Sequence, residues 1–221
     1  MKGKIFNAQE VQAIIAGDKT MFREVIKPRI KVENYKLDDG SGIGMEILLE
    51  ECPYQVGQKI FCKEAWGRKA TGSGIAYKAD NPNQLIYQHL LVKWRLPQHM
   101  KQEHSRLTLE ITDIKVERLK DISEEDAIKE GVNKLFTEEE MKHVLRVHQI
   151  EKNDTYKNYL WHGHIGRTIT KKQSDEWEYQ CSAYEKAKDS FFSLWNATHK
   201  KPEEKFEVNP FVWVVDFKII N

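Results

Sequence analysis

The sequence has little cysteine and almost no net charge. Its three cysteines, Cys52, Cys62 and Cys181, form an odd and widely spaced set. Such a set favours reduced thiols in a cytoplasmic protein over a disulfide framework. The 35 Lys and Arg residues nearly cancel the 34 Asp and Glu residues, which leaves a formal net charge of +1. Nonspecific coating of DNA relies on a large positive excess. The composition therefore argues against that class, although it leaves room for a local basic pocket.

Long apolar runs and several catalytic signatures are also missing. No apolar run approaches the length that spans a membrane, and the first residues, MKGKIFNAQEV, lack the apolar core of a signal peptide. The Gly-x-x-x-x-Gly-Lys phosphate loop, the Gly-x-Ser-x-Gly elbow and the His-Glu-x-x-His pair are absent. We therefore expect a cytoplasmic protein without a membrane partner. The sequence does not specify its oligomeric state.

Short strand patterns dominate what is present. Alternating apolar residues predict strands over residues 4–6, 59–66, 74–78, 92–94, 107–118 and 212–219. Many short strands with few helices indicate a mixed, strongly bent sheet that closes into a small barrel, because closure removes exposed strand edges. The length of 221 residues fits a single domain of the α+β class.

Two helices carry clear start and stop signals. Asn7 and Glu10 form a capping box before an apolar helical face, and Gly17 ends that helix. Ser123 caps a second, shorter helix, which runs to Lys129. Both helices are expected to flank the sheet.

Residues 134–205 differ from the rest of the chain. Two stretches, TEEEMKHVLRVHQIEKN and SDEWEYQCSAYEKAKDSFFSLWNATHK, have the pattern of amphipathic helices. The polar and aromatic piece between them is predicted to be a loop. We interpret the whole region as a helical insertion within the single domain of residues 1–221.

Lys19 and Thr20 follow the expected end of the first helix at Gly17. In a pocket, an ammonium and a hydroxyl at this point can bind phosphate, or the Lys can act as a base. A solvated Lys at a helix C-terminus is also favourable with the helix dipole. The spacing alone favours the solvated helix end.

The stretch KEAW extends the predicted strand at 59–66, where Glu64 and Trp66 share one face and Lys63 lies on the other. In a binding site the indole can stack on a base while the carboxylate accepts an amino proton. The alternative is a cross-strand ion pair beside a Trp of the core, which the pattern alone favours.

Glu130 lies in the last turn of the second helix, where a carboxylate opposes the helix dipole. A carboxylate at this unfavourable position suggests that Glu130 has a role other than stabilising the helix. By contrast, His99, His104, His162 and His164 lack the spacing and support of a metal site. No metal and no cofactor are expected.

Eight stretches in a fixed order carry a family resemblance. They are IAGDKT (15–20), PYQVG (53–57), KEAW (63–66), IAYKAD (75–80), the loop 94–106, residues 119–132, FSLW (192–195) and NPFVW (209–213). Together they resemble the ASCH domain, a member of the PUA-like superfamily, in the larger form found in phages and prophages. The resemblance covers most of the chain outside about residues 133–185.

The resemblance implies a small PUA-like mixed β-barrel with flanking helices and a cleft that binds RNA or a modified nucleoside. One bacterial branch of the family is an amidohydrolase that removes the acetyl group from acetylcytidine with a Lys, a Thr and a Glu. Its Lys matches Lys19 and its Glu matches Glu130. Its Thr matches Phe22, which cannot act as a nucleophile. Either Thr20 takes that role or the hydrolysis is absent.

Binding of RNA or a modified nucleoside is the favoured hypothesis, because it needs no nucleophile at position 22. A base would stack on Trp66 or Trp94, and stacking contributes ~1–3 kcal/mol per base. The residues expected to bind the ligand are Arg23, Glu64, Trp66, Trp94, His99 and Arg106.

Two alternatives stay open. The chain is an amidohydrolase on N-acylated cytidine that acts through Lys19, Thr20 and Glu130, or it is a phage accessory module that binds a partner protein through residues 134–205. The first alternative and the binding hypothesis both require folding to bring Lys19 and Glu130 together.

If Lys19 and Glu130 serve only a ligand, then Lys19→Ala and Glu130→Ala should each abolish binding or turnover. The melting temperature should then stay within a few degrees of the wild-type value, as thermal unfolding would show.

Overall fold

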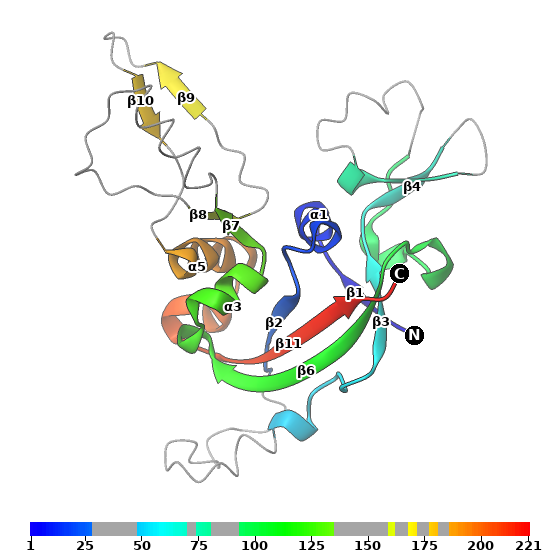
Figure 1. Cartoon of the computed structure of the whole chain (residues 1–221), viewed down its shortest axis with the longest axis horizontal. Helices are drawn as coiled ribbons and strands as arrows, with labels where there is room; N and C mark the ends of the chain where they lie inside the picture. Colours follow the sequence, from blue (N-terminus) through cyan, green and yellow to red (C-terminus); the bar gives the residue numbers. More distant parts are fainter. Residues whose placement is uncertain are drawn as a thin grey trace.

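A five-stranded mixed sheet forms the centre of the molecule (Figure 1). The computed structural model describes residues 1–27, 48–69, 74–80, 93–134, 159–161, 168–171, 177–180 and 186–221. The strand order is β1-β3-β6-β11-β2. The bounds are Lys2–Ile5 for β1, Lys59–Lys63 for β3, Thr108–Arg118 for β6, Phe211–Ile219 for β11 and Met21–Val25 for β2.

The longest pairing, between β6 and β11, bends the sheet. All neighbouring strands are antiparallel except β1 and β3, which are parallel. The β6–β11 register shifts between Asp216 and Phe217, where β6 contributes one extra residue. Such a bulge increases local twist and bends its strand. Figure 1 shows both strands strongly curved.

The curvature brings the two edge strands, β1 and β2, into side-chain contact. Lys4 Nζ lies 2.6 Å from Glu24 Oε2 across the two edges, and Tyr54 donates a hydrogen bond of 2.9 Å to the same oxygen. The Phe6 and Phe22 rings meet edge to face, with 6.0 Å between their centroids. Among the described residues no backbone ladder joins β1 to β2. The sheet is thus an open barrel, and the closed barrel expected from the strand pattern is not observed.

Helix α1, Ala8–Ala16, packs on the inner face of this sheet. Its capping box is formed as predicted: Asn7 accepts from the Glu10 backbone N–H, and Glu10 accepts from that of Asn7. Gly17 ends the helix at φ +82°, a left-handed conformation that favours glycine. Val11 and Ile14 join the inner core with apolar side chains from β2, β3, β6 and β11 and with Phe6, which follows β1.

Helices α3, Glu124–Lys129, and α5, Ala187–Thr198, cover the outer face. The alternation of β11 divides its side chains between the two layers, because successive residues of a strand point to opposite faces. Val212 and Val214 pack outward against Phe191 and Trp195 of α5, whereas Trp213 belongs to the inner core. The chain therefore has a core on each side of one sheet.

Among the described residues, three strand pairs lie outside the central sheet. They are β4, Trp66–Arg68, with β5, Ile75–Tyr77; β7, Val132–Lys134, with β8, Tyr159–Trp161; and β9, Thr168–Lys171, with β10, Trp177–Gln180. Short 3₁₀ turns occupy Lys78–Asp80, Pro97–His99, Gln102–His104, Leu119–Asp121, Pro202–Glu204 and Phe206–Val208. The fold is α+β, and no helix of the described part is long and apolar enough to cross a membrane.

The prediction of a helical region at 134–205 is wrong in part. Strand β10 lies inside the stretch predicted as the second amphipathic helix, and β8 and β9 lie inside the predicted loop. Helix α5 belongs to the outer core rather than to an insertion, because its apolar stripe packs on the sheet. The first amphipathic helix, at 137–153, falls outside the described residues.

The contact between Phe6 and Phe22 gives a test of the open barrel. Phe22→Ala is expected to lower the free energy of unfolding by about 3–5 kcal/mol, since it removes a fully buried ring where the two edges meet. Urea denaturation would measure the loss. Phe22→Leu, which keeps most of the apolar volume, should cost clearly less. A loss below about 1 kcal/mol for Phe22→Ala would show that the contact is dispensable.

Candidate functional site

Folding brings Lys19 and Glu130 together, as the functional hypotheses require. After Gly17, the backbone N–H groups of Asp18 and Lys19 donate to the carbonyl of Ala13 and turn the chain away from α1. Lys19 and Glu130 then form an isolated antiparallel bridge. The chain from near the amino terminus is thereby fixed against the end of α3.

Gly131 makes this approach possible. It adopts φ +100°, and a Cβ at this position would lie 3.4 Å from the Cβ atoms of both Ala13 and Lys19. The close packing holds the end of α3 against the residues that follow α1. Glu130, the C-cap residue of α3, is placed beside Lys19 as a result.

The Lys19 ammonium is buried and bonded to Glu130. Lys19 Nζ donates to Glu130 Oε2 at 2.8 Å and to the Glu130 carbonyl at 3.0 Å. The two residues are only 3% and 4% exposed. An ammonium has three donors. Within the described part of the chain, the third finds no acceptor at hydrogen-bond distance, and Glu10 Oε1 lies 3.9 Å away.

Arg23 occupies the other oxygen of Glu130. Its Nη1 donates to Glu130 Oε1 at 3.1 Å, and its Nη2 donates to Asp126 at 3.1 Å and to Glu117 at 3.3 Å. Its Nε–H is buried and has no acceptor among the described residues. The Glu130 carboxylate is therefore held on both oxygens by cations from the loop before β2 and from β2 itself.

Lys115 completes the network from β6. Its Nζ lies 2.7 Å from Glu117 and 3.1 Å from Asp126. Burial acts to raise the pKa of Asp126, but the hydrogen bonds and charges of Lys115 and Arg23 outweigh it, so the pKa lies below its ordinary value. The network balances three cations against three carboxylates, which are Lys19, Arg23 and Lys115 with Glu117, Asp126 and Glu130.

This geometry corrects the expectation that Lys19 and Glu130 are dispensable for stability. Removing one partner of a buried ion pair leaves an uncompensated charge, which costs about 3–5 kcal/mol. Glu130→Ala would leave the buried Lys19 ammonium with no described carboxylate closer than Glu10 at 3.9 Å, whereas Arg23 would keep Asp126 and Glu117. Loss of function in that variant could not be separated from loss of folding.

Thr20 and Phe22 do not form a nucleophile site with this network. Phe22 is 3% exposed and packs in the inner core against Phe6, Tyr54 and Phe217. The Thr20 backbone donates to the Lys129 carbonyl at 2.9 Å and accepts from Phe217 at 2.9 Å. Among the described residues, the Thr20 hydroxyl has no hydrogen bond to Lys19 or Glu130. No nucleophile is therefore paired with a base here.

Glu64 belongs to a second cluster beyond the end of β3. Arg106 binds both of its oxygens, Nε to Oε1 at 2.9 Å and Nη2 to Oε2 at 3.1 Å, and Arg106 Nη1 reaches Asp80 at 2.6 Å. Burial raises the pKa of the Glu64 carboxyl above its ordinary value, against the opposing effect of Arg106. Glu64 thus forms an ion pair, which was the alternative to base recognition, and its partner is Arg106.

Trp66 is a core residue of this second cluster. It is 1% exposed, and its ring lies 4.5 Å from the His104 ring, centroid to centroid, with the Arg95 guanidinium carbon 5.1 Å from its centroid. A ring covered in this way is not open to stack on a base. Its Nε1–H is buried without an acceptor among the described residues.

Trp94 and His99 lie on the segment that runs beside this cluster. Trp94 is half-buried and His99 is exposed, with its Nε2 3.4 Å from the Gln98 side chain. The six predicted ligand-binding residues are therefore divided, with Arg23 in the first cluster and the other five in or near the second.

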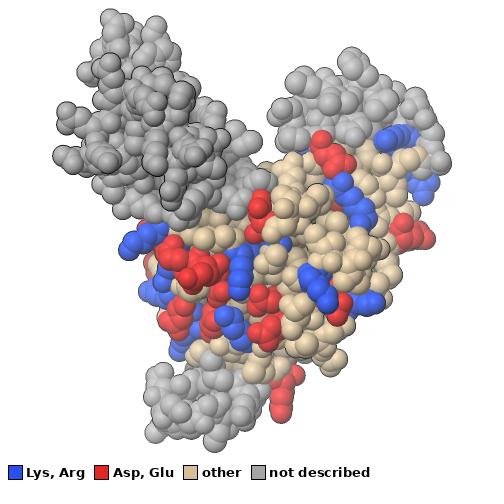
Figure 2. Space-filling view, in the orientation of Figure 1, with Lys and Arg blue, Asp and Glu red and all other residues tan. Residues whose placement is uncertain are grey.

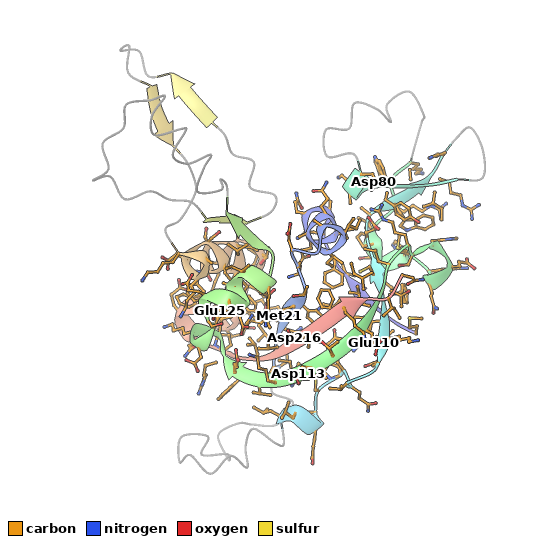
Figure 3. The ribbon with its side chains drawn as sticks, in the orientation of Figure 1. Met21, Asp80, Glu110, Asp113, Glu125 and Asp216 are labelled. Atoms are coloured by element: carbon orange, nitrogen blue, oxygen red, sulfur yellow. The ribbon has the colours of Figure 1, made fainter. Side chains whose placement is uncertain are left out.

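Helix α1 stands between the two clusters. Glu10 faces Lys19, while Gln12 donates a hydrogen bond of 2.5 Å to the carbonyl of Ala79, the residue before Asp80. Figure 3 shows Met21, on the strand of the first cluster, and Asp80, in the second, on opposite sides of this helix. The nine residues of α1 span roughly 13 Å at 1.5 Å per residue.

Sequence reasoning missed Glu10, Glu117 and Asp126 as members of the first cluster. The sequence assigns Glu10 to the capping box of α1, a role that it also fulfils, and Asp126 lies in the acidic first turn of α3, where its backbone N–H donates to the Ser123 side chain. Glu117 alternates outward along β6, which is the available signal that it faces the same layer as Asp126. The described residues contain no group of His, Cys, Asp and Glu side chains that could hold a metal ion, and His162 and His164 lie outside them.

Comparison of the chain with models of protein families, with curated proteins and with solved structures finds no match in any of the three. The resemblance to the ASCH family therefore stays a prediction that depends on the motifs. The site has to be interpreted from its own geometry.

The lowered pKa of Asp126 predicts a pH dependence of stability. A depressed pKa in the folded state stabilises the protein above the unfolded value, about 3.9 for Asp, and the contribution disappears as the pH falls through the folded pKa. Asp126→Asn should therefore lower the free energy of unfolding at pH 7, and its difference from the wild type should shrink between about pH 5 and pH 2. Urea unfolding across this range would measure the difference. Glu125→Gln, at an exposed position of the same helix, is the control. If Asp126→Asn lowers the free energy of unfolding by the same amount at all pH values, the lowered pKa of Asp126 is contradicted.

Proposed function

We propose that the chain binds a nucleobase, either as a modified nucleoside or within RNA, between Lys19 and Glu10. One observation carries the proposal: Lys19 Nζ has one N–H without an acceptor among the described residues, and the second carboxylate near it after that of Glu130, Glu10 Oε1, lies 3.9 Å away. A contact of this length leaves room for a bridging group.

The pair presents a donor beside an acceptor. Lys19 can donate only, and the ionised Glu10 can accept only. A base edge with a carbonyl or ring nitrogen next to an N–H group is complementary to such a pair, and so is an N-acyl amide. Cytosine, uracil and their acylated forms all carry this pattern. The Glu10 side chain is 25% exposed, so the pair is reached from the Glu10 side.

The surrounding network supports a binding role. A whole buried ion network can often be replaced by apolar residues without loss of stability, although removal of one partner destabilises, so stability alone does not account for a network of Lys19, Arg23 and Glu130. Glu130 holds Lys19 through two acceptors, and Arg23 holds Glu130. The open barrel and the helix across its inner face also support the PUA-like architecture that the motifs imply.

Binding is favoured over hydrolysis of an acylated cytidine. Phe22 fills the position of the expected nucleophile and is buried in the inner core, and Thr20 has no hydrogen bond to a base within the described part. A carboxylate and an ammonium without a nucleophile can bind an amide but have no group to attack it. Protein binding through residues 134–205 receives no support from α5, whose apolar stripe is buried against the sheet.

Glu10→Gln tests the proposal without disturbing the fold. Glutamine retains an oxygen for the Asn7 N–H, so the capping box is kept. The substitution removes the negative charge of the carboxylate that would accept a hydrogen bond from the ligand N–H. Hydrogen bonds to charged groups contribute about 1.5–3 kcal/mol, so binding of the best nucleoside should weaken on the order of 10- to 100-fold. Isothermal titration with cytidine, uridine and N4-acetylcytidine would measure it, with chromatography to detect turnover.

Glu51→Gln is the matched control, because it removes an exposed carboxylate from another part of the chain. It should leave the affinity unchanged. Equal affinities for wild type and Glu10→Gln would contradict the proposed site, and release of cytidine from N4-acetylcytidine would favour the amidohydrolase instead.

A further inference from the structure

Positive charge is concentrated in one part of a chain that is nearly neutral overall. Between residues 63 and 106 there are eight Lys and Arg residues against three Asp and Glu residues, although the whole chain carries only +1. Two of the three acids, Glu64 and Asp80, are both bonded to Arg106. The third, Glu103, lies 3.9 Å from Lys101. The cations with no such partner are Lys63, Arg68, Lys69, Lys78, Lys93 and Arg95 within the described ranges.

The fold collects this charge around the β4–β5 hairpin. Trp66 of β4 is paired with Tyr77 of β5 on one side and, through two backbone hydrogen bonds, with Arg95 on the other. Directly opposed residues of a sheet share a face, as do residues two apart on one strand. Arg68 and Arg95 therefore lie on the same face as Trp66 and Tyr77. Figure 2 shows basic side chains at the upper right of the molecule, beside β4.

Aromatic rings support this face. The Arg106 guanidinium carbon lies 4.2 Å from the centroid of the Tyr77 ring, and that of Arg95 lies 5.1 Å from the Trp66 ring. Lys63 Nζ reaches the Gln98 carbonyl at 3.4 Å, which ties the segment at 93–101 to the end of β3. Arg68 and Arg95 are both exposed. These two residues define what we call the basic face.

The two exposed guanidinium groups on one face point to an anionic, acceptor-rich ligand. Phosphate oxygens are strong acceptors for Arg, Lys and N–H donors, and contacts to phosphate position a nucleic-acid strand without reading its sequence.

We infer that the basic face binds the phosphodiester backbone of a single-stranded RNA. This inference rests on the proposed function and narrows it, because it makes the ligand of the Lys19–Glu10 pair a base within a strand rather than a free nucleoside. Helix α1, roughly 10–12 Å across with its side chains, separates the two places and contacts both, through Glu10 and Gln12 on different sides of the helix. A strand of a few nucleotides can therefore bind both together.

Fluorescence anisotropy with a labelled 12-nucleotide oligouridine tests the inference. Binding should weaken as salt rises, with a slope of log K against log salt near −0.7 for each phosphate neutralised. Arg68→Ala and Arg95→Ala together should weaken binding on the order of 10-fold or more and reduce the slope by about 1.4. Lys200→Ala, an exposed cation outside the basic face, should have no effect.

The outcomes separate this inference from the proposed function. Nucleoside binding without RNA binding would overturn the basic face and leave the Lys19–Glu10 site standing. RNA binding that is lost in the double Arg variant but unchanged in Glu10→Gln would support the basic face and overturn the base site. RNA binding that is unaffected by the double variant, or equal binding of a polyglutamate peptide of the same charge, would overturn the inference.

Discussion

The arrangement depends on one carboxylate shared by two cations. Glu130 accepts from Lys19 on one oxygen and from Arg23 on the other, and this pair of contacts ties the end of α3 to the chain on both sides of the start of β2. Since all three groups are buried, the loss of any one removes charge compensation inside the protein. The same contacts fix the direction of the Lys19 ammonium, so structure and proposed function depend on a single set of charges. Asp126, Glu117 and Lys115 extend the network outward and make it neutral.

The fold explains how two unlike clusters can serve one ligand. The bent sheet brings β1 and β2 together through side chains and leaves α1 across the inner face, with the buried ion network at one side and the β4–β5 hairpin at the other. A donor and acceptor pair suits a base, whereas exposed Arg residues supported by aromatic rings suit phosphate. The near-zero net charge of the chain hides this division, because acidic residues elsewhere offset the basic face.

Short sequence patterns predicted individual helices and strands. The partners within the site depend on contacts between residues that are distant in the sequence, which such patterns do not reveal. The capping box at Asn7, the left-handed Gly17 and the long strand at 108–118 follow from short sequence patterns, and the structure confirms them. The partner of Glu64 could not be found this way, because Arg106 is 42 residues distant and bonds it only after folding. Trp66 was expected to stack on a base, but it is buried. Alternation along a strand shows which residues point to the same face of the sheet, and it does not show whether that face is covered. The strand at 177–180 was missed because amphipathic patterns in a charged stretch do not separate helix from strand.

The most direct test is a crystal structure of the chain soaked with N4-acetylcytidine and, separately, with oligouridine. The account predicts electron density for a base between Lys19 Nζ and the Glu10 carboxylate, with the Lys19–Glu130 contact unchanged at about 2.8 Å. Density for the base at another place, with Lys19 and Glu10 still 3.9 Å apart and nothing between them, would contradict the central claim.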